Sequence, residues 1–118
     1  MNTTRLIGKL FAPRQKALDA YATRAVALQD AVLRRLLSEA AGTEWGRAQY
    51  AGIRSYEDYR RLVPVQTYDD VKPYIERMRH GESDVLWKGQ VRWYAKSSGT
   101  TNDKSKFIPV SPDGLKRI

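Results

Sequence analysis

The stretch with the strongest chemical character runs from Ser97 to Lys106. Its first five residues carry four hydroxyl side chains around a single glycine, Gly99, and two lysines follow. Hydroxyl and backbone N–H groups donate hydrogen bonds, glycine lets the main chain approach a ligand, and lysine adds a mobile positive charge. Such a loop, placed between two strands, can wrap a polyphosphate. These residue types are also common in turns, so an ordinary polar hairpin loop is the alternative.

Other common kinds of site fit the sequence poorly. The loop lacks the Gly-Lys-Ser/Thr ending of a Walker A motif and has one glycine where a Rossmann loop needs three. The chain has no cysteine, which excludes disulfides and thiolate chemistry. His80 is the only histidine, so there is no histidine cluster for zinc, and a serine–histidine triad is disfavoured. We expect His80 to be a surface residue at a helix end, and we assign no catalytic residue and no metal ligand.

Two extended segments are expected to hold the loop. Residues 91–96 have strand composition, and residues 107–110 form a second candidate in which Pro109 requires a sheet edge, a strand end or a bulge. The short apolar run 85–87 is a further candidate. We therefore expect a strand, the phosphate loop and a strand over residues 85–110.

The chain before this hairpin is expected to be helical over residues 1–81. Apolar residues recur at spacings of three and four from Leu18 to Leu36, which predicts one amphipathic helix over residues 14–41, ended by Gly42. Its broad apolar face is typical of a surface that packs against a larger body. Residues 43–47 are expected to form a turn.

Two shorter helices and the start of another complete the prediction. Capping residues predict one helix after Ser55 that ends before Pro64, and one from Thr67 to about Arg79. A helix also begins at Ser111, where a cap precedes a proline and an acid. The sequence ends at Ile118, about one turn into that helix, so we expect an N-terminal fragment of a longer protein.

Composition limits the class of protein. A chain of 118 residues, 42% hydrophobic and 29% charged, is typical of one folded domain or part of one. Its net charge of +8 can favour polyanions, and a small basic module that stacks bases on Trp93 and Tyr94 is one alternative function. Ordinary alternation in a strand explains that pattern equally well. A helical interaction domain is another alternative, and it leaves the hydroxyl loop unexplained.

The first twenty residues are rich in basic side chains, which an organellar targeting peptide would also show. The pattern continues without a break into the first long helix, which favours a structural segment. No apolar run approaches the roughly 18 residues that a membrane span needs. We expect a cytoplasmic protein with no membrane and no nucleic-acid partner.

The hydroxyl loop and the residues that follow it resemble a known motif. Ser97-Ser98-Gly99-Thr100-Thr101 followed by Lys106-Phe107-Ile108-Pro109-Val110 resembles the first nucleotide-binding motif of the auxin-responsive acyl acid–amido synthetases, a family of the adenylate-forming superfamily. The resemblance extends in order over nearly the whole chain. Its other stretches are residues 43–47, 63–65, 68–70, 73–75 and 81–87.

The resemblance implies an α/β fold: the N-terminal fragment of the large domain of an adenylate-forming enzyme, mainly helical to about residue 80 and then a β-hairpin around the phosphate loop. It implies ATP and Mg²⁺ as cofactors, a carboxylic acid and an amine such as an amino acid as substrates, and the rest of the same polypeptide as partner. The residues expected to line the ATP phosphates are Ser97, Ser98, Gly99, Thr100, Thr101 and Lys106.

The implied reaction activates a carboxylate as an acyl-adenylate and then conjugates it to the amine. Two further family motifs are absent from the chain, so we expect these 118 residues to be inactive alone. Asn102 and Asp103 stand where many plant members have glycines, which resembles the bacterial branch. An acyl-CoA synthetase remains an alternative, because it shares the hydroxyl loop.

Overall fold

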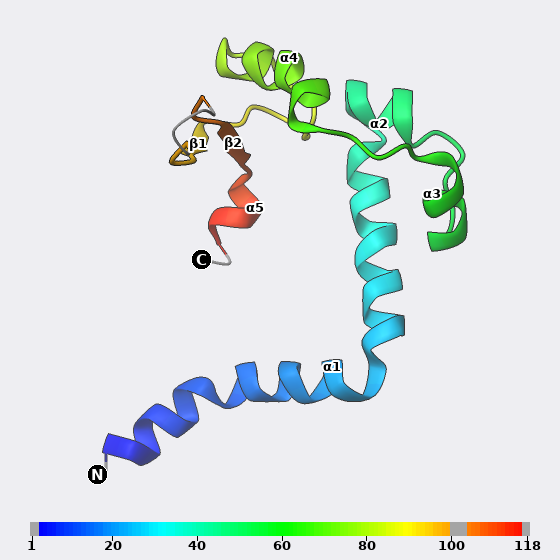
Figure 1. Ribbon diagram of the computed structural model, residues 1–118. Coiled ribbons are helices and arrows are strands. Elements are labelled where there is room, and N and C mark those ends of the chain that lie inside the picture. The colour runs from blue at the N-terminus through cyan, green and yellow to red at the C-terminus, as the bar shows by residue number, and fades with distance from the viewer. Residues whose placement is uncertain (1–2, 100–103, 117–118) are drawn as a thin grey trace.

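The computed structural model describes residues 3–99 and 104–116. The order of elements is four helices, a hairpin and a short helix: α1 (Thr3–Ala40), α2 (Glu44–Gln49), α3 (Tyr56–Leu62), α4 (Tyr68–Arg79), β1 (Trp93–Lys96), β2 (Phe107–Val110) and α5 (Pro112–Leu115) (Figure 1). The chain is thus mainly helical up to Arg79, as the sequence predicts.

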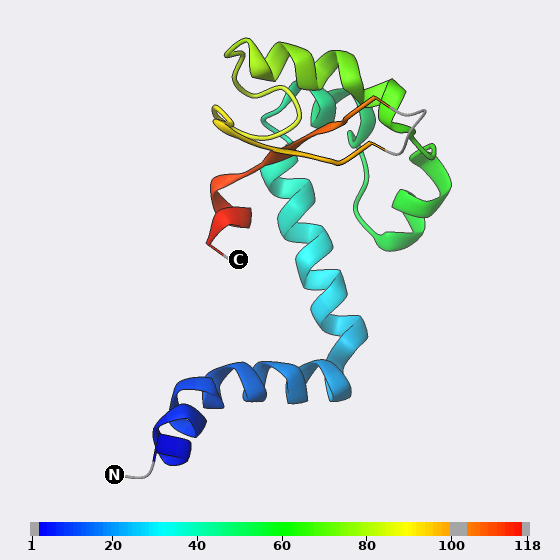
Figure 2. The same ribbon diagram turned by 60° about the vertical axis from the view of Figure 1, so that its left-hand side comes forward.

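The long helix α1 is bent at Arg24, whose φ of −135° and ψ of 31° are not helical. The part of α1 before Arg24, its first arm, stands away from the rest of the chain. The part after Arg24, its second arm, leads into the rest of the chain (Figures 1 and 2). The radius of gyration is 18.3 Å, against roughly 14 Å for a compact chain of this length. The expected helix 14–41 therefore begins too late, since the helical pattern continues back through Pro13 to Thr3.

The apolar face of α1 lies largely in solvent. Leu18 is 58% exposed, Tyr21 51% and Leu36 38%.

No helix within residues 3–99 and 104–116 is long and apolar enough to cross a lipid bilayer.

The buried core lies where α4 meets the segment after it. Met78 on α4 packs with Val85 and Val91, each at most 3% exposed, and Ile75 on the same helix is also 3% exposed. The ring of Tyr74 meets that of Trp45 edge to face at 5.0 Å. These contacts fix α4 against α2 and against the segment that leads to β1.

Residues 43–49 form a cap and a short helix, not the expected turn. The Thr43 side chain, fully buried, accepts from Gly46 N–H at 2.9 Å and donates to the Ala40 carbonyl at 2.8 Å. Thr43 is therefore an effective N-cap for α2. The glycine in the middle of this segment hid the helix, because glycine disfavours helical structure.

Residues 85–87 are not a strand, and β1 begins later, at Trp93. The main chain here bonds instead to the start of α2: Glu44 N–H donates to the Asp84 carbonyl at 2.8 Å and Trp45 N–H to the Val85 carbonyl at 3.0 Å. Val85 is buried by this arrangement. An apolar run that looks like a strand thus satisfies the free N–H groups of a helix start.

The two strands are antiparallel, with Trp93 opposite Val110 and Lys96 opposite Phe107. Ser97 N–H donates to the Lys106 carbonyl at 2.9 Å, which makes Ser97 and Lys106 a hydrogen-bonded pair. Residues alternate along an antiparallel ladder, so the backbone groups of Phe107 and Pro109 point away from β1. Pro109 therefore lies at a sheet edge, as its missing N–H requires. After β2, Ser111 caps α5 by accepting from Gly114 N–H at 3.0 Å.

Candidate functional site

The hairpin brings together the two ends of the hydroxyl loop. Ser97 follows β1 and Lys106 precedes β2, and a backbone hydrogen bond joins these two residues where the strands end. The Ser97 hydroxyl oxygen accepts from Lys106 N–H at 3.0 Å, in addition to the backbone bond between the same residues. The mouth of the loop is therefore closed by two hydrogen bonds, and the first of them uses a lone pair of the serine oxygen and not its O–H.

The structure places the other predicted site residues as follows. Ser98 and Gly99 continue from Ser97 and are exposed, whereas Lys106 is half-buried. Thr100 and Thr101 lie outside the described residues. The described part of the loop thus offers solvent-accessible backbone and hydroxyl groups next to a lysine.

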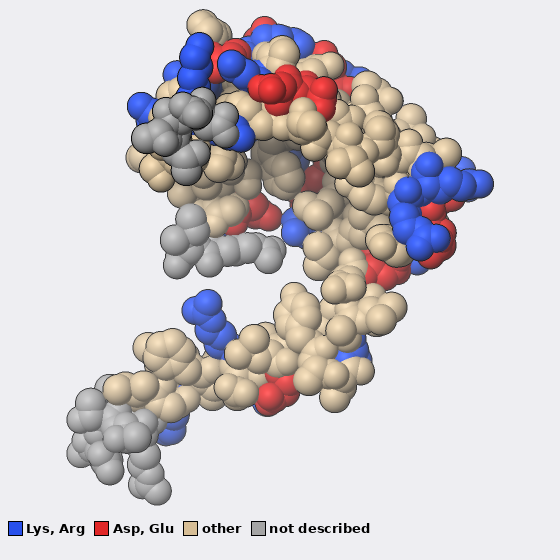
Figure 3. Space-filling model, viewed as in Figure 1, with Lys and Arg blue, Asp and Glu red and all other residues tan. Residues whose placement is uncertain are grey.

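Positive side chains surround the hairpin. Lys106 Nζ lies 5.5 Å from the centre of the Tyr68 ring, and the Arg79 guanidinium carbon lies 3.7 Å from the centre of the Phe107 ring. Arg79 is also paired with the Glu76 carboxylate at 3.0 Å, which offsets part of its charge. Lys96 Nζ approaches the same Phe107 ring at 6.0 Å. Lys and Arg side chains gather at this end of the molecule, at the upper left of Figure 3. Such a concentration of positive charge favours an anion.

Sequence reasoning missed Tyr68, which joins α4 to β2. Its hydroxyl accepts from Phe107 N–H at 3.0 Å and donates to the Phe107 carbonyl at 3.2 Å. Two sequence signals involve Tyr68: its position after the Thr67 cap and its place in the resembling stretch 68–70. Neither indicates a partner 39 residues away.

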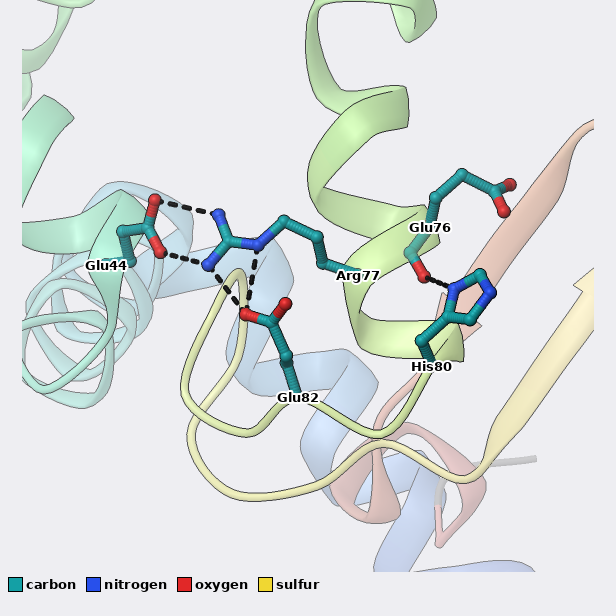
Figure 4. A network of polar contacts seen from close by, with 5 residues as sticks. All are labelled: Glu44, Glu76, Arg77, His80 and Glu82. Atoms are coloured by element: carbon teal, nitrogen blue, oxygen red, sulfur yellow. Dashed lines mark hydrogen bonds and ion pairs between the residues drawn. The ribbon is translucent and has the colours of Figure 1, made fainter.

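A second polar network lies at the other end of α4 (Figure 4). The Arg77 guanidinium donates to both oxygens of Glu44, at 3.0 and 2.7 Å, and to Glu82 at 2.9 and 2.7 Å. These hydrogen bonds hold the pKa of each of the two carboxyl groups below its ordinary value, and they raise the pKa of Arg77. The network ties α2 and the segment after α4 together, so its role is structural.

His80 ends α4 and is exposed. Its Nδ1 lies 2.7 Å from the Glu76 carbonyl oxygen (Figure 4). A carbonyl can only accept, so Nδ1 carries the hydrogen in this contact. The expectation of a surface residue at a helix end is confirmed.

A concavity of about 540 Å³ lies between the second arm of α1 and the turn after α2. Three arginines, Arg34, Arg47 and Arg54, contribute to its lining, but no residue of the hairpin does. Arg34 is bound to Asp30 at 2.8 Å and Arg47 to the Gly42 carbonyl at 2.9 Å. Two of these three arginines are thus held by contacts within the protein, whereas the hairpin combines a lysine with a hydroxyl-rich loop.

Comparison with known proteins gives consistent results. Residues 14–118 match the model of the GH3 family N-terminal domain. The chain is 37% identical over 105 residues to the indole-3-acetic acid-amido synthetase GH3.17 of Arabidopsis thaliana, covering 86% of this chain and 17% of that protein. It is 32% identical over 90 residues to the jasmonoyl-L-amino acid synthetase JAR6 of Nicotiana attenuata, covering 73% of this chain and 15% of that protein.

Solved structures agree with these sequence matches. The GH3.15 acyl acid amido synthetase superposes with a TM-score of 0.76 at 32% identity, covering 86% of this chain and 19% of the other. A second structure of this kind, in complex with 2,4-DB, gives a TM-score of 0.69 at 34% identity over 77% of this chain and 16% of the other. The chain thus spans less than a fifth of each of these proteins. From the family match over residues 14–118 and these two fold matches, the chain belongs to the GH3 family and has the fold of its N-terminal domain.

Proposed function

We propose that residues 1–118 are the N-terminal part of the adenylating domain of an ATP-dependent acyl acid–amido synthetase. We propose further that Ser97, Ser98, Gly99, Thr100, Thr101 and Lys106 hold the phosphates of ATP. The observation that carries this is the double hydrogen bond between Ser97 and Lys106, which closes a hydroxyl-rich loop beside several positive side chains. The relatives named above are amido synthetases, which favours the amide-forming branch over a thioester-forming one.

In the proposed reaction, a carboxylate oxygen attacks the α-phosphorus of ATP and pyrophosphate leaves. The amine then attacks the acyl carbon, loses a proton and displaces AMP, which forms the amide. The hairpin would bind the β- and γ-phosphates and orient them as the leaving group. Its hydroxyl groups would donate hydrogen bonds and would not act as nucleophiles.

The described residues fit a phosphate group. Ser97 keeps its O–H when it accepts from Lys106 N–H, so the same side chain can close the loop and donate to a ligand. Lys106 lies half-buried at the same position, which limits the solvent that screens its charge. Together they provide a hydroxyl donor and an ammonium at the loop mouth.

Mg²⁺ has a less direct place in this proposal. Within residues 3–99 and 104–116, no three or more His, Cys, Asp or Glu side chains lie together in a way that could hold a metal ion. We therefore propose that Mg²⁺ accompanies the nucleotide by binding to its phosphate oxygens. When bound there, it would neutralise negative charge on the phosphates.

The exposed apolar face of α1 supports the proposal that this chain is part of a larger protein. Leu10 and Val26 are 77% and 81% exposed, and the relatives are about six times longer than the matched region. Burial of such side chains yields about 25 cal/mol per Å². We propose that the rest of the same polypeptide covers this face, that the substrates are a carboxylic acid and an amino acid, and that the enzyme is cytoplasmic.

A chimeric enzyme tests the proposed function. Residues 14–118 replace the matching segment of the Arabidopsis GH3.17 synthetase, and ATP–pyrophosphate exchange dependent on indole-3-acetic acid is measured. We expect exchange in the chimera and a loss of about 10- to 100-fold in Ser98→Ala, because a hydrogen bond to a charged group is removed. Thermal melting of both proteins shows whether they are folded. A folded chimera without exchange, or exchange unchanged in Ser98→Ala, would contradict the proposal.

A further inference from the structure

Tyr68 occupies an unusual position relative to the hairpin. It is the first residue of α4, and its hydroxyl contacts both backbone groups of one residue of β2: it accepts from Phe107 N–H at 3.0 Å and donates to the Phe107 carbonyl at 3.2 Å. A hydroxyl has one donor and two acceptor lone pairs, so it can satisfy both groups at once. A single side chain thereby holds the first residue of β2.

The strand register explains why Phe107 needs such a partner. Because Ser97 and Lys106 form a hydrogen-bonded pair, the N–H and carbonyl of the next residue, Phe107, point away from β1. These groups would otherwise bond to a further strand or to water. The Tyr68 hydroxyl takes the place of a neighbouring strand at this one residue.

The same tyrosine also reaches the predicted phosphate lysine. Lys106 Nζ lies 5.5 Å from the centre of the Tyr68 ring, within the range in which an ammonium is attracted to an aromatic face. Lys106 in turn donates its backbone N–H to the Ser97 hydroxyl. Tyr68 therefore contacts the loop end at two points, the backbone of Phe107 and the side chain of Lys106.

The start of α4, where Tyr68 lies, is itself held by a capping interaction. The Asp70 carboxylate accepts from the Thr67 N–H and from the Thr67 hydroxyl, each at 2.7 Å, which fixes the start of α4. Further along, Ile75 and Met78 anchor the helix in the core. Contacts in the core therefore fix the position of Tyr68, and the Tyr68 hydroxyl in turn fixes the end of the loop.

We infer that Tyr68 is a positioning residue for phosphate binding: it fixes the C-terminal end of the hydroxyl loop and aims Lys106 without contacting the nucleotide itself. This inference rests on the proposed function of the hairpin. It favours Lys106 over the exposed Lys104 as the lysine that meets phosphate.

The test uses the 118-residue chain labelled with ¹⁵N, with inorganic tripolyphosphate as the probe. Tyr68→Phe removes the hydroxyl and keeps the ring, and Tyr68→Leu removes both. Tyr56→Phe is the matched control, because Tyr56 is 58% exposed. Two quantities are measured: amide hydrogen exchange in the free chain, and tripolyphosphate affinity from shifts of the Ser97, Ser98 and Gly99 amides.

For Tyr68→Phe we expect exchange at the Phe107 amide to be about tenfold faster and tripolyphosphate affinity to be about three- to tenfold weaker. Exchange at the Ile75 and Met78 amides should not change, whereas a general loss of stability would make exchange faster at these amides as well. Tyr68→Leu should weaken affinity further, because the contact with Lys106 is lost as well.

The outcomes separate the two proposals. Slow exchange at the Ile75 and Met78 amides shows that the unsubstituted chain is folded. If that folded chain shows no tripolyphosphate shifts at the loop amides, the phosphate site itself is contradicted and the role of Tyr68 falls with it. If that chain binds and Tyr68→Phe binds equally well, only the role of Tyr68 is wrong. It is also wrong if exchange rises equally at Phe107, Ile75 and Met78, since Tyr68 would then serve overall stability alone.

Discussion

The Cα of Gly46 faces the carbonyl group of Ala40 so closely that a Cβ at this position would lie 1.8 Å from the carbonyl oxygen. That oxygen accepts from Thr43 N–H at 2.8 Å and from the Thr43 hydroxyl at 2.8 Å, so it cannot move without loss of the cap. The junction between α1 and α2 therefore requires glycine for reasons of space.

Gly46→Ala should accordingly destabilise the chain, although alanine favours helices over glycine by about 1 kcal/mol. Overpacking against fixed atoms costs about 1–3 kcal/mol, so the net sign should be a loss in the free energy of unfolding. Urea denaturation followed by tryptophan fluorescence measures it. Gly42→Ala is the control, because no atom lies within 4 Å of a Cβ there. A more stable Gly46→Ala variant would show that the junction can relax.

Acid should weaken the junction that Arg77 makes. Its hydrogen bonds lower the pKa of Glu44 and of Glu82, so their contribution to stability is present above the ordinary carboxyl pKa of about 4.5 and is lost as the pH falls through the lower folded values. We expect Arg77→Met to flatten the fall in urea midpoint between about pH 5 and pH 3. The pKa of Asp58 is also lowered, by hydrogen bonds from the backbone of Arg54 and the Ser55 hydroxyl, so part of the fall should remain. A profile identical to that of the unsubstituted chain would mean that the network contributes nothing.

Lys106 and Lys104 should differ in the chimeric enzyme described above. Lys106 is half-buried beside Tyr68, whereas Lys104 is exposed. We expect Lys106→Ala to lower kcat/KM for ATP by about 10- to 100-fold, and Lys104→Ala to lower it by less than about threefold. Steady-state kinetics with varied ATP makes the comparison. The reverse order would assign the phosphate contact to Lys104.

The 118-residue chain alone should not catalyse acid-dependent ATP–pyrophosphate exchange at any concentration of carboxylic acid tested. Two further motifs that the family resemblance leads us to expect are not in its sequence, so a bound triphosphate would have no aligned carboxylate. Exchange is measured with radiolabelled pyrophosphate, and full-length GH3.17 synthetase serves as the positive control. Clear exchange by the chain would overturn this expectation.

Local signals predicted much of the fold. The caps at Ser55, Thr67 and Ser111 marked three helix starts correctly, because a cap depends on residues three or four apart. The strands around the loop were found within two residues at the first strand and at the expected place for the second. Gly42, expected to end α1, is not among the glycines with positive φ. The helix therefore ends without the left-handed glycine that often follows a helix.

Contacts between distant residues account for what was missed. Residues 85–87 had strand composition, but their backbone partners lie about forty positions earlier, at the start of α2. The link from Tyr68 to Phe107 likewise has no local signature. For the proposed phosphate site, the sequence predicts the loop, which stays a prediction, and the structure adds the closure between Ser97 and Lys106. The assignment to the bacterial branch stays a prediction.

The outer edge of β2 has a consequence for association between chains. Only Phe107 and Pro109 direct backbone groups away from β1, and the first is bonded to Tyr68 while the second has no N–H. A strand from another molecule would find no free N–H donor along this edge. The hairpin can therefore carry exposed Trp93 and Ile108, 65% and 51% accessible, without offering this edge as a template for aggregation.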